Sequence, residues 1–231
     1  MLLEVIATTV NDAVLAERHG ADRIELISGI LEGGLTPSLG LMEGVREAVG
    51  IPVRVMVRPH ARSFRYDKAD VETMLRDIRH IAAIGGLSVV MGMLRRDRTV
   101  DEELLKQLLQ AADGMEVTFH RAFDEAEDQL EALEILSRYP QVTDILTSGG
   151  QRTAPEGAER IAVLERLSSA KSVSILAGSG LTASGLREFL GETAVERVHF
   201  GSAVREDSDP LRPIDPGRLQ EVRSILDLWG K

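Results

Sequence analysis

The feature that most constrains the fold is an alternation of short, β-branched apolar runs with longer amphipathic segments rich in charge. Eight apolar runs are candidates for strands, and each is followed by a candidate helix. The chain has 231 residues, so the repeating unit is about 29 residues long, which is typical of a (β/α)8 barrel. The candidate strands are Leu2–Ala7, Asp22–Ile27, Val53–Arg58, Ser88–Met93, Glu116–Arg121, Asp144–Thr147, Ser172–Gly178 and Arg197–Gly201. The clearest candidate helices are Asn11–His19, Asp67–Ala83, Asp101–Ala112, Glu125–Arg138, Pro155–Ser168, Ala183–Leu190 and Pro216–Trp229.

The main alternative is an open, doubly wound sheet, which usually has fewer strands at this length. That alternative is weakened because no Gly-x-Gly-x-x-Gly motif follows the first candidate strand. No linker or low-complexity segment divides the chain. The sequence therefore predicts an α/β protein with one domain over residues 1–231, a (β/α)8 TIM barrel.

Charge and cysteine content exclude several classes of function. The formal net charge is −10, and no Lys/Arg stripe with interleaved aromatics is present, so we expect no nucleic-acid partner and no docking on anionic membranes. The chain has no cysteine, which removes disulfides, thiolate nucleophiles and thiolate metal ligands. The first residues, MLLEVIA, lack the basic region of a signal peptide, and no apolar stretch approaches the ~20 residues that span a bilayer. We expect a cytoplasmic protein.

Alternation along the strands predicts which side chains point into the barrel. In PVRVMVR the valines form one apolar face that suits the helix layer, so Arg54, Met56 and Arg58 point inward. The same parity applies to the other strands. The polar residues that it places inside come from five strands and are Glu4, Arg23, Glu25, Arg54, Arg58, Thr118, His120 and His199.

Buried charges must pair with one another, with water or with a ligand. For Arg23 and Arg54, near the starts of their strands, a structural ion network is favoured. For Arg58, His120 and His199, late in their strands, a role in a pocket is favoured. Glu4 and Glu25 lie between these two cases. Helix or loop positions explain the other histidines, which are His19, His60 and His80.

Several loops follow strands and are expected at the mouth of the barrel, where barrel enzymes have their sites. Ser28–Ser38 is long and rich in glycine, and Pro59–Tyr66 is basic with two aromatics, so we expect both to form a lid or a pocket wall. Three further loops are rich in serine and glycine and are candidates for an anion or phosphate site, in which backbone amides approach the ligand closely. Their residues are Ser148 and Gly149, then Gly178, Ser179 and Gly180, then Gly201 and Ser202.

These motifs resemble those of the CutC family. RIELISGILEGGLTPSLGL (Arg23–Leu41) is similar to the pattern in which an RIEL strand leads to a loop ending in GGLTPS. VMVRP, TFHRAFD (Thr118–Asp124), ILTSGG and the Gly-Ser-Gly and FGSA loops match in order and at similar spacing, so the resemblance covers essentially the whole chain. It implies a (β/α)8 barrel, a cytoplasmic location, a tendency to form homo-oligomers and a role in copper homeostasis.

The resemblance also implies copper as a ligand, and here the chain departs from the family. Relatives often carry cysteine after RIEL and in the first strand, where this chain has Ile27 and Ile6. Cu(I) prefers thiolate and thioether ligands, so direct binding is not expected from these positions. Met91 and Met93 offer thioethers, although packing explains them better. Imidazole and carboxylate ligands at His120, His199, Glu4 and Glu25 would suit Zn(II) better than Cu(I).

Three functions remain open from the sequence. The first is the family role, a protein linked to copper handling directly or indirectly. The second is an enzyme acting on a small anionic or phosphorylated metabolite, in which His120 is the acid and base, Glu4 or Glu25 orients it, and Arg58 holds the anion. Asp124 would assist there, although the run Asp-Glu-Ala-Glu is first of all a helix cap. The third is a sensor that binds a small molecule without catalysis.

Overall fold

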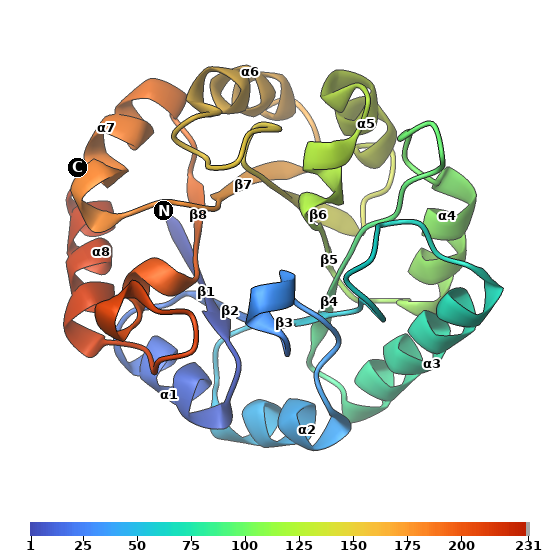
Figure 1. Ribbon diagram of the computed structural model, residues 1–231, viewed down its shortest axis with the longest axis horizontal. Coiled ribbons are helices and arrows are strands. Elements are labelled where there is room, and N and C mark those ends of the chain that lie inside the picture. Colours follow the sequence, from blue (N-terminus) through green and yellow to red (C-terminus); the bar gives the residue numbers. More distant parts are fainter. Residues whose placement is uncertain (230–231) are drawn as a thin grey trace.

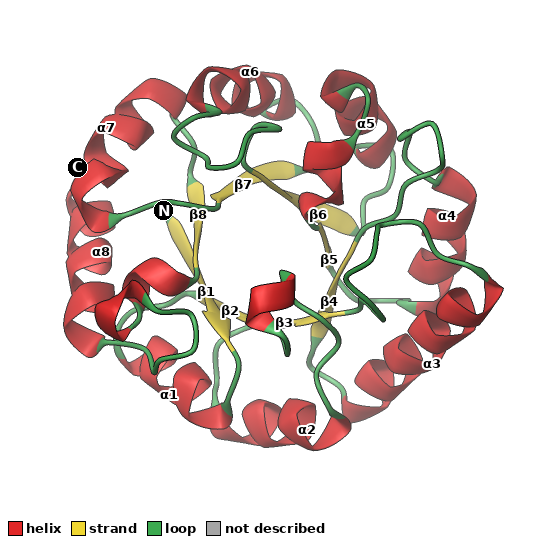
Figure 2. Ribbon diagram, in the orientation of Figure 1, coloured by secondary structure: helices red, strands yellow, loops and turns green. Residues whose placement is uncertain are grey.

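The computed structural model describes residues 1–229 and shows a closed barrel of eight parallel strands surrounded by eight helices (Figures 1 and 2). The predicted TIM-barrel fold is confirmed. The strands are β1 (Leu2–Ala7), β2 (Arg23–Leu26), β3 (Val53–Met56), β4 (Ser88–Met91), β5 (Val117–Phe119), β6 (Val142–Thr147), β7 (Ser174–Gly178) and β8 (Arg197–Phe200). Pairing of β8 with β1 closes the barrel and sets His199 opposite Glu4.

The helices alternate with the strands and form the outer ring. They are α1 (Val10–Arg18), α2 (Leu39–Ala48), α3 (Lys68–Ile84), α4 (Glu102–Ala111), α5 (Gln129–Leu136), α6 (Ala158–Ser168), α7 (Ala183–Thr193) and α8 (Pro216–Trp229). Side-chain caps begin many of them, and at α3 Asp67 and Asp70 form a reciprocal capping box. Among residues 1–229, no helix is long and apolar enough to cross a membrane.

Two helices differ from the sequence-based expectation. Helix α2 has no clear sequence signal because two glycines interrupt it and a glycine-rich loop precedes it; Ser38 starts it by accepting a hydrogen bond from the Leu41 amide. The predicted helix Glu125–Arg138 is divided. Its first residue, Glu125, is the last residue of a 3-10 turn, Arg121–Glu125, and α5 begins only after Asp128, which caps it.

The two faces of the strands carry different residues, as the alternation predicted. Val53, Val55 and Val57 are buried in the main apolar core, which lies between the barrel and the helices. Met91 and Met93 belong to this same core, so packing accounts for them. Inside the barrel, a small separate cluster contains Ile27, Met56 and Val90.

An ion network centred on Asp144 fills the barrel interior near the strand starts. Its carboxylate accepts hydrogen bonds from Arg23 Nη1 at 3.1 Å, from Arg54 Nη1 at 2.6 Å and from Arg197 Nη1 at 2.7 Å. Arg54 also contacts the hydroxyls of Thr118 and Thr143. Arg23 and Arg54 therefore have the structural role predicted for them. Their shared counter-ion is Asp144, which was not predicted from the sequence to lie inside the barrel.

We predict that Asp144→Asn destabilises the fold by about 3–5 kcal/mol, because it leaves buried arginines without their shared counter-ion. Arg23 and Arg54 are only 4% and 2% exposed, so water cannot replace the lost carboxylate. Urea unfolding of the variant measures this loss. The matched control Asp113→Asn lies on the surface and should change stability by less than about 0.5 kcal/mol. A loss below about 1 kcal/mol for Asp144→Asn would contradict this role.

Candidate functional site

A cavity of about 550 Å³ opens at the carboxyl ends of the strands. Two predicted loops contribute to its wall, through Ile30, Glu32 and Gly33 after β2 and through Phe64 after β3. The short turn Ile30–Glu32 lies over the barrel opening in Figure 1. Apolar and charged side chains both line the cavity, which is the composition expected of a site for a small organic molecule.

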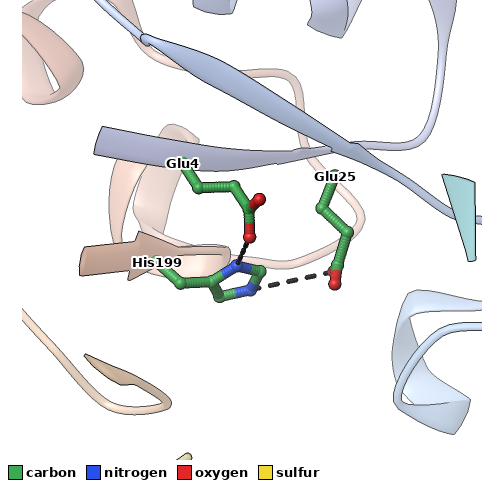
Figure 3. A group of neighbouring side chains, drawn as sticks. All are labelled: Glu4, Glu25 and His199. Atoms are coloured by element: carbon green, nitrogen blue, oxygen red, sulfur yellow. Dashed lines mark hydrogen bonds and ion pairs between the residues drawn. The ribbon is translucent and has the colours of Figure 1, made fainter. Parts of the chain in front are cut away.

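Glu4, Glu25 and His199 meet at this cavity from the adjacent strands β1, β2 and β8 (Figure 3). The Nδ1 atom of His199 is 2.8 Å from Glu4 Oε1, and its Nε2 atom is 3.8 Å from Glu25 Oε2. All three side chains are buried, and Glu25 and His199 line the cavity. Glu4 Oε2 is 2.5 Å from Arg23 Nε, which joins this trio to the ion network below.

The surroundings of the two glutamates give their carboxyl groups opposite pKa shifts. Burial opposes ionisation of Glu4, but Arg23 and His199 outweigh it and lower its pKa to about 2. Burial raises the pKa of Glu25 to about 7, since His199 compensates only in part and the Glu4 charge adds to the increase. Burial also disfavours the His199 imidazolium, yet Glu25 and Glu4 raise its pKa above the ordinary value. The pKa of Glu25 is therefore raised to about 7, and that of the adjacent His199 is raised above its ordinary value.

The same trio is the only group of at least three histidine or acidic side chains in residues 1–229 that is compact enough to hold a metal ion. Both Glu4 oxygens already have partners, His199 Nδ1 and Arg23 Nε, so Glu25 and His199 Nε2 remain as ligands. His120, expected to share a metal with His199, does not belong to the group. It lies at the end of β5, where its ring packs on Phe64 with centroids 4.8 Å apart.

His120 does not have the acid–base character expected of it. Burial, and then the nearby Arg58 charge, lower its pKa to about 3, so the ring is neutral at neutral pH. Its Nδ1 atom accepts a hydrogen bond from the Ala122 amide at 3.1 Å. The pairing of an imidazole with Glu4 and Glu25 was expected for His120, but it belongs to His199. The closure of β8 onto β1 is the signal that could have found it.

Arg58 was expected to hold an anion, yet one end of its guanidinium group already has partners. Arg58 Nη1 donates to the backbone oxygens of Glu32, Gly33 and Gly34 at 3.0–3.3 Å. The guanidinium carbon lies 4.7 Å from the centre of the Phe64 ring. Arg58 thus fastens the loop after β2 to the cavity wall.

Two of the three serine and glycine loops reach the cavity. Ser179 and Gly180 after β7 line it, as do Gly201 and Ser202 after β8. Gly178 lies behind them, where an added Cβ would come within 2.7 Å of a Leu146 methyl carbon. These positions agree with the predicted binding face, apart from Gly178.

The third loop, containing Ser148 and Gly149, is not available to a ligand, which corrects the expectation for these residues. The carboxylate of Asp124 occupies it and accepts hydrogen bonds from the Ser148 amide at 3.1 Å and the Gly150 amide at 3.0 Å. The hydroxyls of Thr147 and Ser148 add to this set, and the Gly149 amide donates to Thr147. The protein's own side chain is the anion here, and Asp124 is not the cap of the following helix.

We predict that the pKa values of the two buried histidines lie on opposite sides of the ordinary value of 6.5, with His199 above it and His120 below it. Long-range ¹H–¹⁵N NMR should show His199 as imidazolium above pH 6.5 and His120 as neutral imidazole well below it. The variants His199→Gln and His120→Gln assign the signals. Titration of both rings together near pH 6.5 would contradict the geometry described above.

The model of the CutC family matches residues 1–204 of the chain. A family protein CutC from Sinorhizobium medicae is 42% identical over 229 residues, with 98% of this chain and 91% of that protein covered. The human copper homeostasis protein cutC homolog is 39% identical over 207 residues, with coverage of 90% and 75%. A solved copper homeostasis protein CutC from Streptococcus agalactiae has a TM-score of 0.80 at 29% identity, covering 86% of this chain and 97% of that one. The chain belongs to the CutC family.

Proposed function

We propose that this chain is an enzyme that moves a proton on a small anionic metabolite, with Glu25 as the base and His199 as its proton-sharing partner. The observation that carries this proposal is the Glu25–His199 pair, 3.8 Å apart at a cavity of about 550 Å³. Burial and the neighbouring Glu4 carboxylate raise the pKa of Glu25 to about 7, although His199 opposes the increase. A general base is most effective when its pKa lies near the working pH. Glu4 holds the imidazole in place through Nδ1, as a triad carboxylate does.

The loops after β7 and β8 favour an anionic group on the substrate. Gly180 and Leu181 line the cavity, and their amides donate to no other group in residues 1–229. Ser179 has a φ of 81° and Gly180 a φ of 72°, so the chain turns in the left-handed region directly after β7. Ser202, on the neighbouring loop, adds a hydroxyl. This half of the cavity suits a carboxylate or phosphate.

Direct binding of Cu(I) does not fit the residues present. The chain has no cysteine, and the cavity presents carboxylate and imidazole groups with Met56 as its one sulfur ligand. Met91 and Met93 are wholly buried in the core outside the barrel. Since Cu(I) prefers thiolate and thioether ligands, a role of this chain in copper homeostasis would be indirect, through the metabolite that it converts.

The proposed activity predicts enzyme-dependent exchange of a carbon-bound hydrogen with solvent. We would incubate the protein in D₂O with aldoses, ketoses and 2-oxo acids of small size, each with and without a phosphate, and follow deuterium incorporation by NMR. The rate should increase as pH rises through about 7, because the ionised form of Glu25 is the base. Glu25→Gln should lower it by at least about 100-fold.

Glu165→Gln is the matched control for this experiment. Burial, and secondarily Glu196, raise the pKa of Glu165 to about 7 as well, but its side chain lies on α6 and does not line the cavity. This variant should leave both the rate and its pH dependence unchanged. Absence of enzyme-dependent exchange across the whole panel, or equal rates for Glu25→Gln and wild type, would overturn the proposal.

The absence of a Cu(I) site predicts a negative result in an anaerobic titration. The purified protein should fail to withdraw Cu(I) from a chromophoric chelator, because the chain has no thiolate and the cavity offers a single thioether, Met56. Stoichiometric withdrawal that is lost in Met56→Leu would contradict this expectation and assign the metal to the cavity.

A further inference from the structure

Two side chains that line the cavity, His120 and Arg58, each carry a buried hydrogen-bond donor that has no partner in residues 1–229. Because His120 Nδ1 accepts the Ala122 amide hydrogen, the neutral ring must carry its proton on Nε2. That Nε2 atom is buried and has no hydrogen-bond partner in residues 1–229. The Nε atom of Arg58 is likewise buried and has no hydrogen-bond partner in residues 1–229. An unsatisfied buried donor is costly, which points to an acceptor that a ligand supplies.

The two donors belong to one assembly. The ring of Phe64 contacts both side chains, with its centre 4.7 Å from the Arg58 guanidinium carbon and 4.8 Å from the His120 ring centre. Arg58 and His120 both line the same cavity as Glu25 and His199. An acceptor oxygen that binds them would therefore share the cavity with the acid–base pair.

The assembly is also rigid. Gly92 packs directly against the imidazole, since a Cβ there would come within 2.4 Å of His120 Nδ1. The Ala122 amide donates to the same Nδ1 atom and fixes the ring orientation, and Arg58 Nη1 donates to three backbone oxygens. Donors that are fixed before the substrate arrives stabilise developing charge without a cost of reorganisation.

We infer that His120 Nε2–H and Arg58 Nε–H bind the carbonyl oxygen of the substrate, so that the reaction is an enolisation or isomerisation of a carbonyl compound. This inference rests on the proposed function and adds two catalytic residues and a substrate class to it. His120 acts as a neutral hydrogen-bond donor, and Glu25 acts as the base.

The step balances without a further reactant. The Glu25 carboxylate takes a proton from the carbon next to the carbonyl, and the electron pair of that C–H bond forms a carbon–carbon double bond. The carbonyl π electrons move to oxygen, and the resulting oxyanion accepts hydrogen bonds from His120 and Arg58. Return of the proton from Glu25 or His199 to the same carbon re-forms the carbonyl and gives exchange. In a 2-hydroxy carbonyl compound, the hydroxyl proton can first move to the oxyanion; return of the carbon-bound proton to the former carbonyl carbon then forms the new carbonyl group and gives isomerisation.

The test compares two replacements of His120 in the deuterium-exchange assay. His120→Leu removes the donor and should slow exchange by about 100-fold or more. His120→Gln keeps an N–H at similar reach and should retain most of the rate. His80→Leu, an exposed position on α3, is the control and should behave as wild type.

A second measurement needs no variant. Glycolohydroxamate, which mimics the enediolate, should bind wild-type protein and move the His120 Nε2 proton strongly downfield in the NMR spectrum, because that proton gains an oxyanion partner. The inference is overturned if the signal does not move, or if His120→Leu exchanges within about threefold of wild type while Glu25→Gln is inactive. The second outcome leaves the proposed function intact, whereas retained exchange in Glu25→Gln would overturn both.

Discussion

The buried ion pair between Arg23 and Glu4 is the interaction on which both halves of the barrel interior depend. Arg23 is also bound to Asp144, so it joins the network at the strand starts to the reactive groups at the strand ends. Because Arg23 keeps Glu4 ionised, Glu4 can hold His199 through Nδ1. Burial raises the pKa of Glu25 to about 7, His199 opposes this increase, and the ionised Glu4 adds to it. The charge that Arg23 maintains on Glu4 therefore contributes to the state of Glu25.

The two histidines at the cavity show how environment separates their roles. His199 lies between two carboxylates, which favour the imidazolium form. His120 lies beside a cation and an aromatic ring, which favour the neutral form. The proposed reaction uses this difference: one side of the cavity would exchange protons, and the other would supply neutral hydrogen-bond donors. Such a pairing of a titrating group with a neutral donor is typical of enzymes that form enolates.

The sequence predicted the architecture well because the strand–helix period and the face alternation are local properties. Parity along each strand also predicted inward-facing polar side chains such as Glu4, Arg23 and Glu25, but it missed Asp144. It could not assign partners, because these depend on how distant strands meet. Only barrel closure sets His199 beside Glu4. Only the turn after β5 carries Asp124 into the loop after β6, where it fills the amides expected to bind a ligand.

Infrared difference titration of wild type against Glu25→Gln tests the central claim most directly, since the protonated carboxyl band reports the state of Glu25 itself. The protonated carboxyl band of Glu25 should be present in acid and disappear as pH rises through about 7. Disappearance near the ordinary value of 4.5 would contradict the proposed role of Glu25, because its carboxyl group would then have an unshifted pKa and would not be a base tuned to neutral pH.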